Sequence, residues 1–283
     1  MIKKYYTLLR EHGYDDVHAH QVIGWLVQHI KNKDFVGLLS QPLILSGIEE
    51  RQLQKFINEL LIDKKPLQYI LGSVLFCGLE LFVEPPVLIP RPETEEWVSE
   101  LIDFLKSRQP LKILDLCTGS GCIALALAKN LPQSKIVGAD ISSEALALAE
   151  KNRRSLVVDN VLFVRSDLFE NIQDKGFDVI VANPPYISEY EWFQLDSVVK
   201  NWEDKRALVA GDQGLTLIKK IIQEGPNYFK KDSLSLLVLE IGFSQAEEVC
   251  TFMRSCGYTD VKVQRDLAGL DRVVMGRYVA KKK

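Results

Sequence analysis

The chain of 283 residues has little of several features that mark particular classes of protein. Its five cysteines are few, odd in number and without a Cys-x-x-Cys pair, which argues against a disulfide scaffold and for a reducing cytoplasm. It lacks an apolar run near the ~20 residues that a membrane helix needs, and we expect no membrane association. It also lacks an excess of basic charge, because 35 Lys and Arg stand against 38 Asp and Glu. We therefore expect no broad neutralisation of nucleic-acid phosphates.

The composition is that of an ordinary globular protein, with 47% hydrophobic and 26% charged residues. The pattern along the chain predicts three parts. Residues 1–70 form a small helical domain that binds a partner protein, residues 71–92 form a β-hairpin and a stiff proline-rich linker, and residues 93–283 form the catalytic domain. The hairpin is predicted from the β-forming residues around Gly78, and the linker from the four prolines between 85 and 92.

Two clear helical patterns lie in the first part. Apolar residues recur at helical spacing between Val22 and Ile30 and again between Leu53 and Leu61. Ser46, followed three residues later by Glu49, predicts a capping box where the second helix begins.

In the last part, predicted strands and helices alternate, which is typical of a parallel sheet covered on both faces. The predicted strands are 113–116, 136–139, 161–164, 179–182, 236–241, 261–264 and 272–278. One helix is predicted to begin at 93, and four more are predicted to span 123–129, 143–153, 215–229 and 245–255. Ser244 and Glu247 predict a capping box for the last of them. Because only a short turn separates the last two strands, we expect them to pair antiparallel. The predicted fold is α/β, a doubly wound, mostly parallel sheet with an antiparallel C-terminal edge.

Polar residues and glycines follow the first three of these strands. The first strand leads into a loop that includes Gly119 and Gly121, which let the backbone approach a ligand closely. Asp140 ends the second strand and is placed to accept the hydroxyls of a ribose. Asp167 and Leu168 follow the third and would receive an adenine amino group and pack on its ring. Alone, the glycines are also compatible with a tight turn or with a dinucleotide fingerprint, but the three strand ends together favour a nucleoside ligand.

The fourth strand is followed by Asn183, Pro184, Pro185 and Tyr186, a stiff corner rich in hydrogen-bond acceptors. Prolines have no N–H, so this backbone offers carbonyls only, and the Asn183 side chain adds one acceptor and one donor. Such a corner suits a planar –NH₂ group: two acceptors would hold both N–H bonds and stabilise the positive charge that develops when the nitrogen attacks a methyl group. A common Asn-Pro turn is the alternative for the motif taken alone.

These motifs resemble a known family. Residues 115–121 and 183–186, together with 66–72 (PLQYILG), 88–95 (LIPRPETE) and 271–278 (DRVVMGRY), are similar to the HemK/PrmC protein-(glutamine-N5) methyltransferases. The resemblance implies the S-adenosylmethionine-dependent methyltransferase fold and transfer of the methyl group of S-adenosyl-L-methionine, with S-adenosyl-L-homocysteine as product. The implied substrate is the glutamine of the Gly-Gly-Gln motif in class I peptide chain release factors, methylated in the cytoplasm by what we expect to be a monomer without a metal.

The resemblance also implies roles for particular residues. The cofactor site would be lined by Cys117, Thr118, Gly119, Ser120, Gly121, Asp140, Leu168 and Asn183, with Asp167 beside them. The substrate amide would be held by Asn183, Pro184, Pro185 and Tyr186. The chain departs from the family pattern at Cys117, where many members have Gly, at Leu168, where some have Trp, and at Asp204, where Pro is usual. We expect an ordinary φ at Cys117 and retained cofactor binding.

Other functions fit parts of the pattern. An adenine-N6 DNA methyltransferase would use the same tetrapeptide on an exocyclic amine, but it must grip and flip DNA, for which the acidic balance is unsuited. A related enzyme methylating a ribosomal-protein glutamine would use the same chemistry. An NAD-linked oxidoreductase would fit the glycine loop, yet all four histidines lie between residues 12 and 29, far from that loop in sequence. A further alternative is a binding module that has this fold and binds the cofactor but does not transfer a methyl group.

Overall fold

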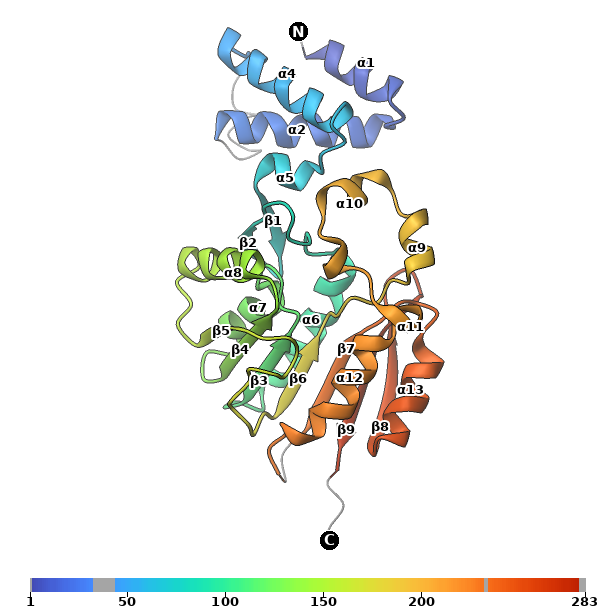
Figure 1. The fold of residues 1–283 in the computed structure, drawn as a ribbon. Helices are drawn as coiled ribbons and strands as arrows, with labels where there is room; N and C mark the ends of the chain where they lie inside the picture. The colour runs from blue at the N-terminus through green and yellow to red at the C-terminus, as the bar shows by residue number, and fades with distance from the viewer. Residues whose placement is uncertain (1, 33–43, 232–233, 280–283) are drawn as a thin grey trace. The chain divides into compact units, whose positions relative to one another are not determined.

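The computed structural model describes residues 2–32, 44–231 and 234–279 of the chain. The chain forms two compact units (Figure 1). One consists of Met1–Ser73 with Asp196–Trp202, and the other of Val74–Leu195 with Glu203–Lys283.

The first unit is helical. Its helices are α1 (Lys3–Glu11), α2 (Asp16–Lys31), α4 (Gly47–Leu61), α5 (Leu67–Leu71) and α10 (Ser197–Trp202). The capping box predicted at Ser46 and Glu49 is confirmed: the Ser46 hydroxyl accepts the Glu49 N–H, and the Glu49 carboxylate accepts the Ser46 N–H. The buried faces of α1, α2 and α4 form one apolar core, which includes Leu9, Leu26 and Ile57.

A β-hairpin opens the second unit, as predicted, with β1 (Ser73–Phe76) and β2 (Leu79–Phe82). Cys77 and Gly78 form its two-residue turn with φ of 48° and 74°. Two consecutive positive φ values are the geometry that matches the twist of paired strands.

A seven-stranded sheet carries the rest of this unit. Its strands are β3 (Lys112–Leu116), β4 (Lys135–Asp140), β5 (Val161–Arg165), β6 (Val179–Ala182), β7 (Leu236–Glu240), β8 (Tyr258–Arg265) and β9 (Asp271–Tyr278). The strand order is β5-β4-β3-β6-β7-β9-β8, in which the first five are parallel and β9 is antiparallel to both neighbours. The strand order reverses between β3 and β6, so the carboxyl ends of these strands are where a ligand is expected.

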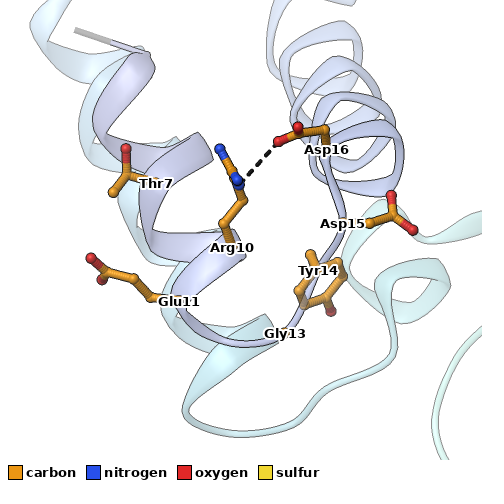
Figure 2. Close-up of a pocket in the computed structure, with 7 residues that line it drawn as sticks. All are labelled: Thr7, Arg10, Glu11, Gly13, Tyr14, Asp15 and Asp16. Carbon is orange, nitrogen blue, oxygen red and sulfur yellow. Dashed lines mark ion pairs between the residues drawn. The ribbon is translucent and has the colours of Figure 1, made fainter.

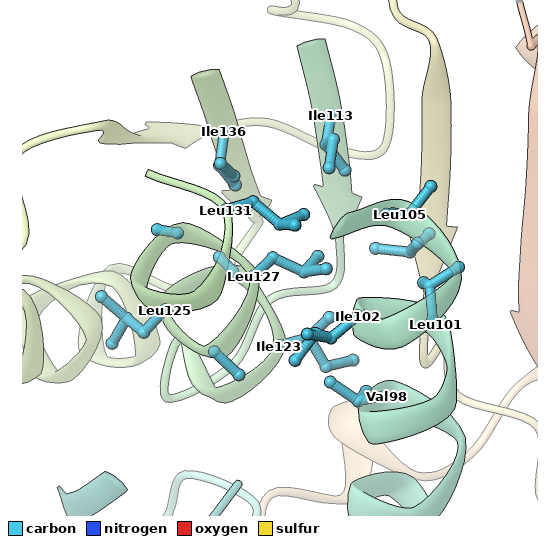
Figure 3. Close-up of a cluster of buried hydrophobic side chains, with 14 of the residues drawn as sticks. Val98, Leu101, Ile102, Leu105, Ile113, Ile123, Leu125, Leu127, Leu131 and Ile136 are labelled. Atoms are coloured by element: carbon cyan, nitrogen blue, oxygen red, sulfur yellow. The ribbon is translucent and has the colours of Figure 1, made fainter. Parts of the chain in front are cut away.

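Helices cover both faces of the sheet, so the doubly wound, mostly parallel architecture is confirmed. On one face, α6 (Pro92–Lys106) and α7 (Cys122–Asn130) pack against strand residues such as Ile113 and Ile136 (Figure 3). On the other face, α12 (Thr216–Glu224) and α13 (Ala246–Ser255) pack against alternate residues of the same strands, such as Leu114. A further helix, α8 (Ser143–Ser155), joins β4 to β5.

Two predictions about helices are corrected, and one stretch of short helices was not predicted. The helix predicted to reach 229 ends at Glu224, because Pro226 has no N–H and favours the short 3₁₀ turn η2 (Gly225–Asn227). The capping box predicted at Ser244 is absent: Gln245 is the N-cap, with no side-chain cap bond, and its side chain bonds elsewhere. Between β6 and α12 the chain also forms elements that were not predicted, namely α9 (Glu189–Gln194), α10, η1 (Lys205–Ala207) and α11 (Gly211–Gly214).

Candidate active site

A cavity of about 330 Å³ lies in the second unit at the carboxyl ends of the parallel strands. The predicted site residues that line it are Cys117, Gly119, Asp140, Asp167, Leu168, Asn183 and Pro185. They come from the loops after β3, β4, β5 and β6, so one edge of the sheet gathers segments that are far apart in the sequence. The cavity therefore lies at the carboxyl ends of the strands, where a ligand was predicted.

The loop after β3 presents its backbone to the cavity. A Cβ added at Gly119, where φ is 56°, would meet no heavy atom of the described residues within 4 Å apart from its chain neighbours, so this backbone faces open space. The prediction of an ordinary φ at Cys117 is wrong: φ is 58°, in the left-handed region that a Cβ disfavours by roughly 1–2 kcal/mol. The chain is held there by its next residue, because the Thr118 N–H donates to the carbonyl of Ala139 over 3.0 Å.

Three predicted cofactor residues of this loop support it without lining the cavity. Thr118 is buried and its hydroxyl donates to Asp115 Oδ2 over 2.5 Å. Ser120 is buried and its carbonyl accepts from the Asn152 side chain. Gly121 precedes α7 with φ of 82°, which L side chains rarely adopt, and a Cβ there would lie 3.0 Å from the Phe163 side chain, which would have to shift to admit a larger residue.

Two carboxyl groups near this loop have raised pKa values. Burial raises the pKa of Asp140, although its two oxygens accept the N–H groups of Gly119 and Ser142 over 2.8 and 2.9 Å. Burial also raises the pKa of Asp115 to about 7. Asp115 Oδ2 accepts from Thr118 and from the Ala124 N–H, whereas Oδ1 is buried without a hydrogen-bond partner among the described residues.

The Asn183 side chain has one of its two polar groups committed. Its Nδ2 donates to Thr94 Oγ1 over 3.3 Å. The carbonyl oxygen Oδ1 is therefore the atom of this amide left to accept a hydrogen bond from a ligand. Pro185 lines the same cavity as Asn183, with the loop from Ser166 to Leu168.

Pro184 and Tyr186 line a smaller cavity of about 20 Å³ next to the first, and Asn183, Leu88 and Ala207 line both. The Tyr186 hydroxyl donates to Glu240 Oε1 over 3.3 Å. Burial, and then the negative charge of Glu240, raise the pKa of Tyr186, so the phenol stays neutral. The Tyr186 carbonyl accepts from Gln245 Nε2 over 2.9 Å, which fixes the backbone of the corner.

Sequence reasoning missed part of the cavity wall. The proline-rich segment contributes Pro86, Val87 and Leu88, and the segment after β6 contributes Asp204, Arg206 and Ala207. The two segments are joined, since the Asp204 N–H donates to the carbonyl of Pro86 and the Arg91 guanidinium pairs with the buried Glu203. Apolar residues between prolines are a signal that could have found Val87 and Leu88, because a stiff segment presents them in one conformation.

A second, open hollow of about 640 Å³ lies on the first unit between α1 and α2 (Figure 2). Across it Arg10 pairs with Asp16, with Nε and Oδ1 3.0 Å apart. Its other polar residues include Glu11 and Asp15, and Asp15 caps α2. These residues are those of a surface depression between two helices, so the cavity of the second unit is the candidate active site.

Comparison with known proteins identifies the family. Residues 98–200 match the family model described as the methyltransferase small domain. The release factor glutamine methyltransferase of Thermodesulfovibrio yellowstonii is 38% identical over 253 residues, 88% of this chain and 89% of that protein. The chain belongs to the release factor glutamine methyltransferase family. The member from Geobacter sulfurreducens is also 38% identical, over 89% of this chain and 87% of its own.

The fold agrees with this assignment. A crystal structure of a methyltransferase from Pyrococcus furiosus superposes with a TM-score of 0.54 at 20% identity, over 82% of this chain and 99% of that one. The resemblance to the HemK/PrmC enzymes and the S-adenosylmethionine-dependent methyltransferase fold are thus confirmed, and the chain is a methyltransferase. Membership of the release factor glutamine methyltransferase family favours this reading over an NAD-linked oxidoreductase or an adenine-N6 DNA methyltransferase. Within residues 2–32, 44–231 and 234–279, no helix has both the length and the apolar character to cross a membrane.

Proposed function

We propose that this enzyme methylates the side-chain amide N5 of the glutamine in the Gly-Gly-Gln motif of class I peptide chain release factors, using S-adenosyl-L-methionine. The observation that carries the proposal is the position of Asn183 and Pro185 in the wall of the cavity that Asp140 and Asp167 also line. The residues that we assign to the nucleoside and those that we assign to the substrate amide thus line one cavity.

The lining residues fit the proposed cofactor. Asp140 and Asp167 offer carboxylate acceptors for hydroxyl and amino groups, and the Gly119 backbone borders open space. Leu168, Val87 and neighbouring side chains provide an apolar surface for an aromatic base. When bound, the cofactor supplies an electrophilic methyl group on a sulfonium and leaves as S-adenosyl-L-homocysteine.

The corner suits the substrate amide for a physical reason. The nitrogen of a carboxamide is a poor nucleophile because its lone pair is delocalised into the carbonyl group. Asn183 Oδ1 and the carbonyls of Pro184 and Pro185 can accept both N–H bonds, which favours the pyramidal nitrogen that forms as its lone pair localises. The reaction replaces one N–H of the glutamine by N–CH₃, and the proton leaves to solvent after the carbon–nitrogen bond has formed. Tyr186 stays neutral and serves as a packing and positioning group.

The first unit has a separate role in the proposal. Its helices carry neither the glycine loop nor the Asn-Pro-Pro-Tyr corner, so we assign it to binding of the release factor. We also expect the enzyme to act as a cytoplasmic monomer, without a metal and without direct contact to nucleic acid.

The proposal is tested by incubating the full-length enzyme with S-adenosyl-L-methionine labelled in its methyl group and a purified class I release factor. Peptide mapping should place the label on the Gly-Gly-Gln glutamine. A release factor with Ala at that glutamine serves as the matched control and should stay unlabelled. Equal labelling of both substrates, or labelling only of a ribosomal protein offered in parallel, would overturn the proposed substrate.

A further inference from the structure

Glu240, the last residue of β7, is a buried carboxyl group that the proposed function does not use directly. Its side chain is almost fully enclosed, with the residue only 1% exposed. Oε2 accepts the Thr94 hydroxyl over 2.7 Å and the Trp97 indole N–H over 2.8 Å, and Oε1 accepts the Tyr186 hydroxyl over 3.3 Å. A buried carboxyl group with three donors is a fixed point to which α6 and the Asn-Pro-Pro-Tyr corner are both attached.

The direction of these hydrogen bonds follows from the chemistry of the donors. The indole N–H of Trp97 can only donate, so Oε2 of Glu240 accepts it, and the same carboxylate oxygen accepts the Thr94 hydroxyl. The single hydroxyl hydrogen of Thr94 therefore points at the same oxygen. Thr94 Oγ1 is left to accept, and its partner is Nδ2 of Asn183 at 3.3 Å. The donor chain runs from Asn183 through Thr94 to Glu240.

This direction decides which way the Asn183 amide faces. An amide can be turned by 180° at little cost unless a neighbour discriminates between its oxygen and its nitrogen. Thr94 discriminates between the two here, because its hydroxyl hydrogen already bonds to Glu240. Its oxygen can therefore only accept a hydrogen bond, which requires a donor from Asn183. Nδ2 is held at Thr94, and Oδ1 remains available to the cavity.

We propose that Thr94 and Glu240 are positioning residues for methyl transfer, which act through Asn183 by holding its amide with Oδ1 toward the substrate nitrogen. The inference rests on the proposed function, since it assigns a task to the same corner. Glu240 also accepts a hydrogen bond from the Tyr186 hydroxyl. One carboxyl group therefore helps to orient both the first and the last residue of the Asn-Pro-Pro-Tyr tetrapeptide.

The charge around Glu240 agrees with this role. Arg272 on β9 lies close enough to favour the ionised form of Glu240, and Asp266 holds its guanidinium with Nη2 and Oδ2 2.9 Å apart. Burial still raises the pKa of Glu240 above its usual value. The direction of the bond from Thr94 is the one that the ionised carboxyl group requires, because a carboxylate oxygen can only accept.

Conservative and disruptive substitutions separate this role from simple packing. Thr94→Val keeps the shape but removes both hydrogen bonds of the hydroxyl, and we expect kcat to fall by about 10- to 100-fold, as for a small misplacement of a reacting group. Thr94→Ser keeps the hydroxyl and should retain most of the turnover. Glu240→Gln keeps an oxygen that can accept from Thr94 and Trp97, so it should also retain most of the turnover. Glu240→Leu has no acceptor in its side chain and should lose most of the turnover.

The experiment compares these variants with the wild-type enzyme in kcat and KM for the release factor, in the dissociation constant of S-adenosyl-L-methionine and in thermal unfolding. We expect kcat to fall in Thr94→Val with the cofactor dissociation constant changed by less than about threefold. Thr259→Val, which removes an exposed hydroxyl on β8, is the matched control and should not affect kcat.

Two outcomes overturn the inference while leaving the proposed function intact: a wild-type enzyme that methylates the glutamine together with a Thr94→Val variant of equal kcat, or equal losses in Thr94→Val and Thr94→Ser. A wild-type enzyme that does not methylate the release factor contradicts the proposed function instead. If Thr94→Val does not fold, the Glu240→Gln and Glu240→Leu pair provides the same comparison.

Discussion

The main-chain N–H of Gly119 donates a hydrogen bond to Oδ2 of Asp140 over 2.8 Å. This bond joins the loop after β3 to the end of β4 at the edge of the cavity that both residues line. Oδ1 of the same carboxyl group accepts the Ser142 N–H over 2.9 Å. The Asp140 side chain is therefore held in one orientation by both of its oxygens, so a ligand meets a preorganised acceptor.

Removal of this acceptor should weaken cofactor binding before it affects turnover. A hydrogen bond to a charged group contributes about 1.5–3 kcal/mol, so we expect Asp140→Ala to raise the dissociation constant of S-adenosyl-L-methionine by roughly 10- to 100-fold. Isothermal titration calorimetry measures this value. Asp159→Ala, at a highly exposed side chain, is the control. An unchanged dissociation constant in Asp140→Ala would remove Asp140 from the cofactor site.

Asn183→Ala should have the opposite profile. It removes the acceptor assigned to the substrate amide, and loss of one such group typically costs about 100- to 1000-fold in kcat. We expect thermal unfolding to change little, because among the described residues the side chain makes a single long hydrogen bond, to Thr94. Steady-state kinetics with a release factor tests this expectation.

The control for Asn183→Ala is Asn160→Ala. Asn160 lies just before β5, and its side chain donates to the carbonyls of Ala128 in α7 and of Leu131 and Ser134 between α7 and β4, away from the carboxyl ends of the strands. Its removal should lower stability while leaving kcat near that of the wild-type enzyme. Similar kcat values for Asn183→Ala and the wild-type enzyme would refute the assigned role.

A third prediction concerns the support of the corner. Gly214, at the end of α11, has φ of 86°, and a Cβ there would lie 1.9 Å from the Tyr186 carbonyl oxygen. Gly214→Ala should therefore displace Tyr186 or α11, which lowers the melting temperature by several degrees and reduces kcat. Gly269→Ala is the matched control, because φ is 79° there and, among the described residues, a Cβ would meet no heavy atom within 4 Å other than those of its chain neighbours. Equal effects of the two substitutions would show that backbone strain alone is responsible.

Local patterns predicted the framework of this enzyme well and its tertiary contacts poorly. The strands β3, β6 and β7 were predictable because buried parallel strands are continuous apolar runs. The φ of Cys117 was not, since a bond between the N–H of Thr118 and the carbonyl of Ala139 on the neighbouring strand holds that turn. The helix α12 ends before the predicted residue 229 because Pro226, which lacks an N–H, terminates it.

The supporting residues of the site show the same limit. Glu240 is an acid at the end of an otherwise apolar strand, a pattern like that of Asp140, and the strand-end argument could have found it. Thr94 could not be found in this way, because 146 residues separate it from Glu240 and its neighbours in sequence are those of an ordinary helix start. Contacts of this kind depend on how α6 packs against β7.

The last prediction concerns the pH dependence of stability. Asp115 keeps its proton in the folded enzyme up to a pKa of about 7, because it is buried, whereas an exposed aspartate loses it near 3.8. Between these pH values the folded state binds more protons than the unfolded state, so the free energy of unfolding falls as pH rises, by about 1.4 kcal/mol per pH unit at most.

Asp115→Asn cannot titrate and should lack this slope. We therefore expect urea denaturation of the cofactor-free enzyme from pH 4 to 8 to show a change in relative stability. The free energy of unfolding of Asp115→Asn should rise by a few kcal/mol relative to that of the wild-type enzyme. Asp103→Asn, at an exposed side chain, is the control, and parallel curves for Asp115→Asn and the wild type would contradict the raised pKa.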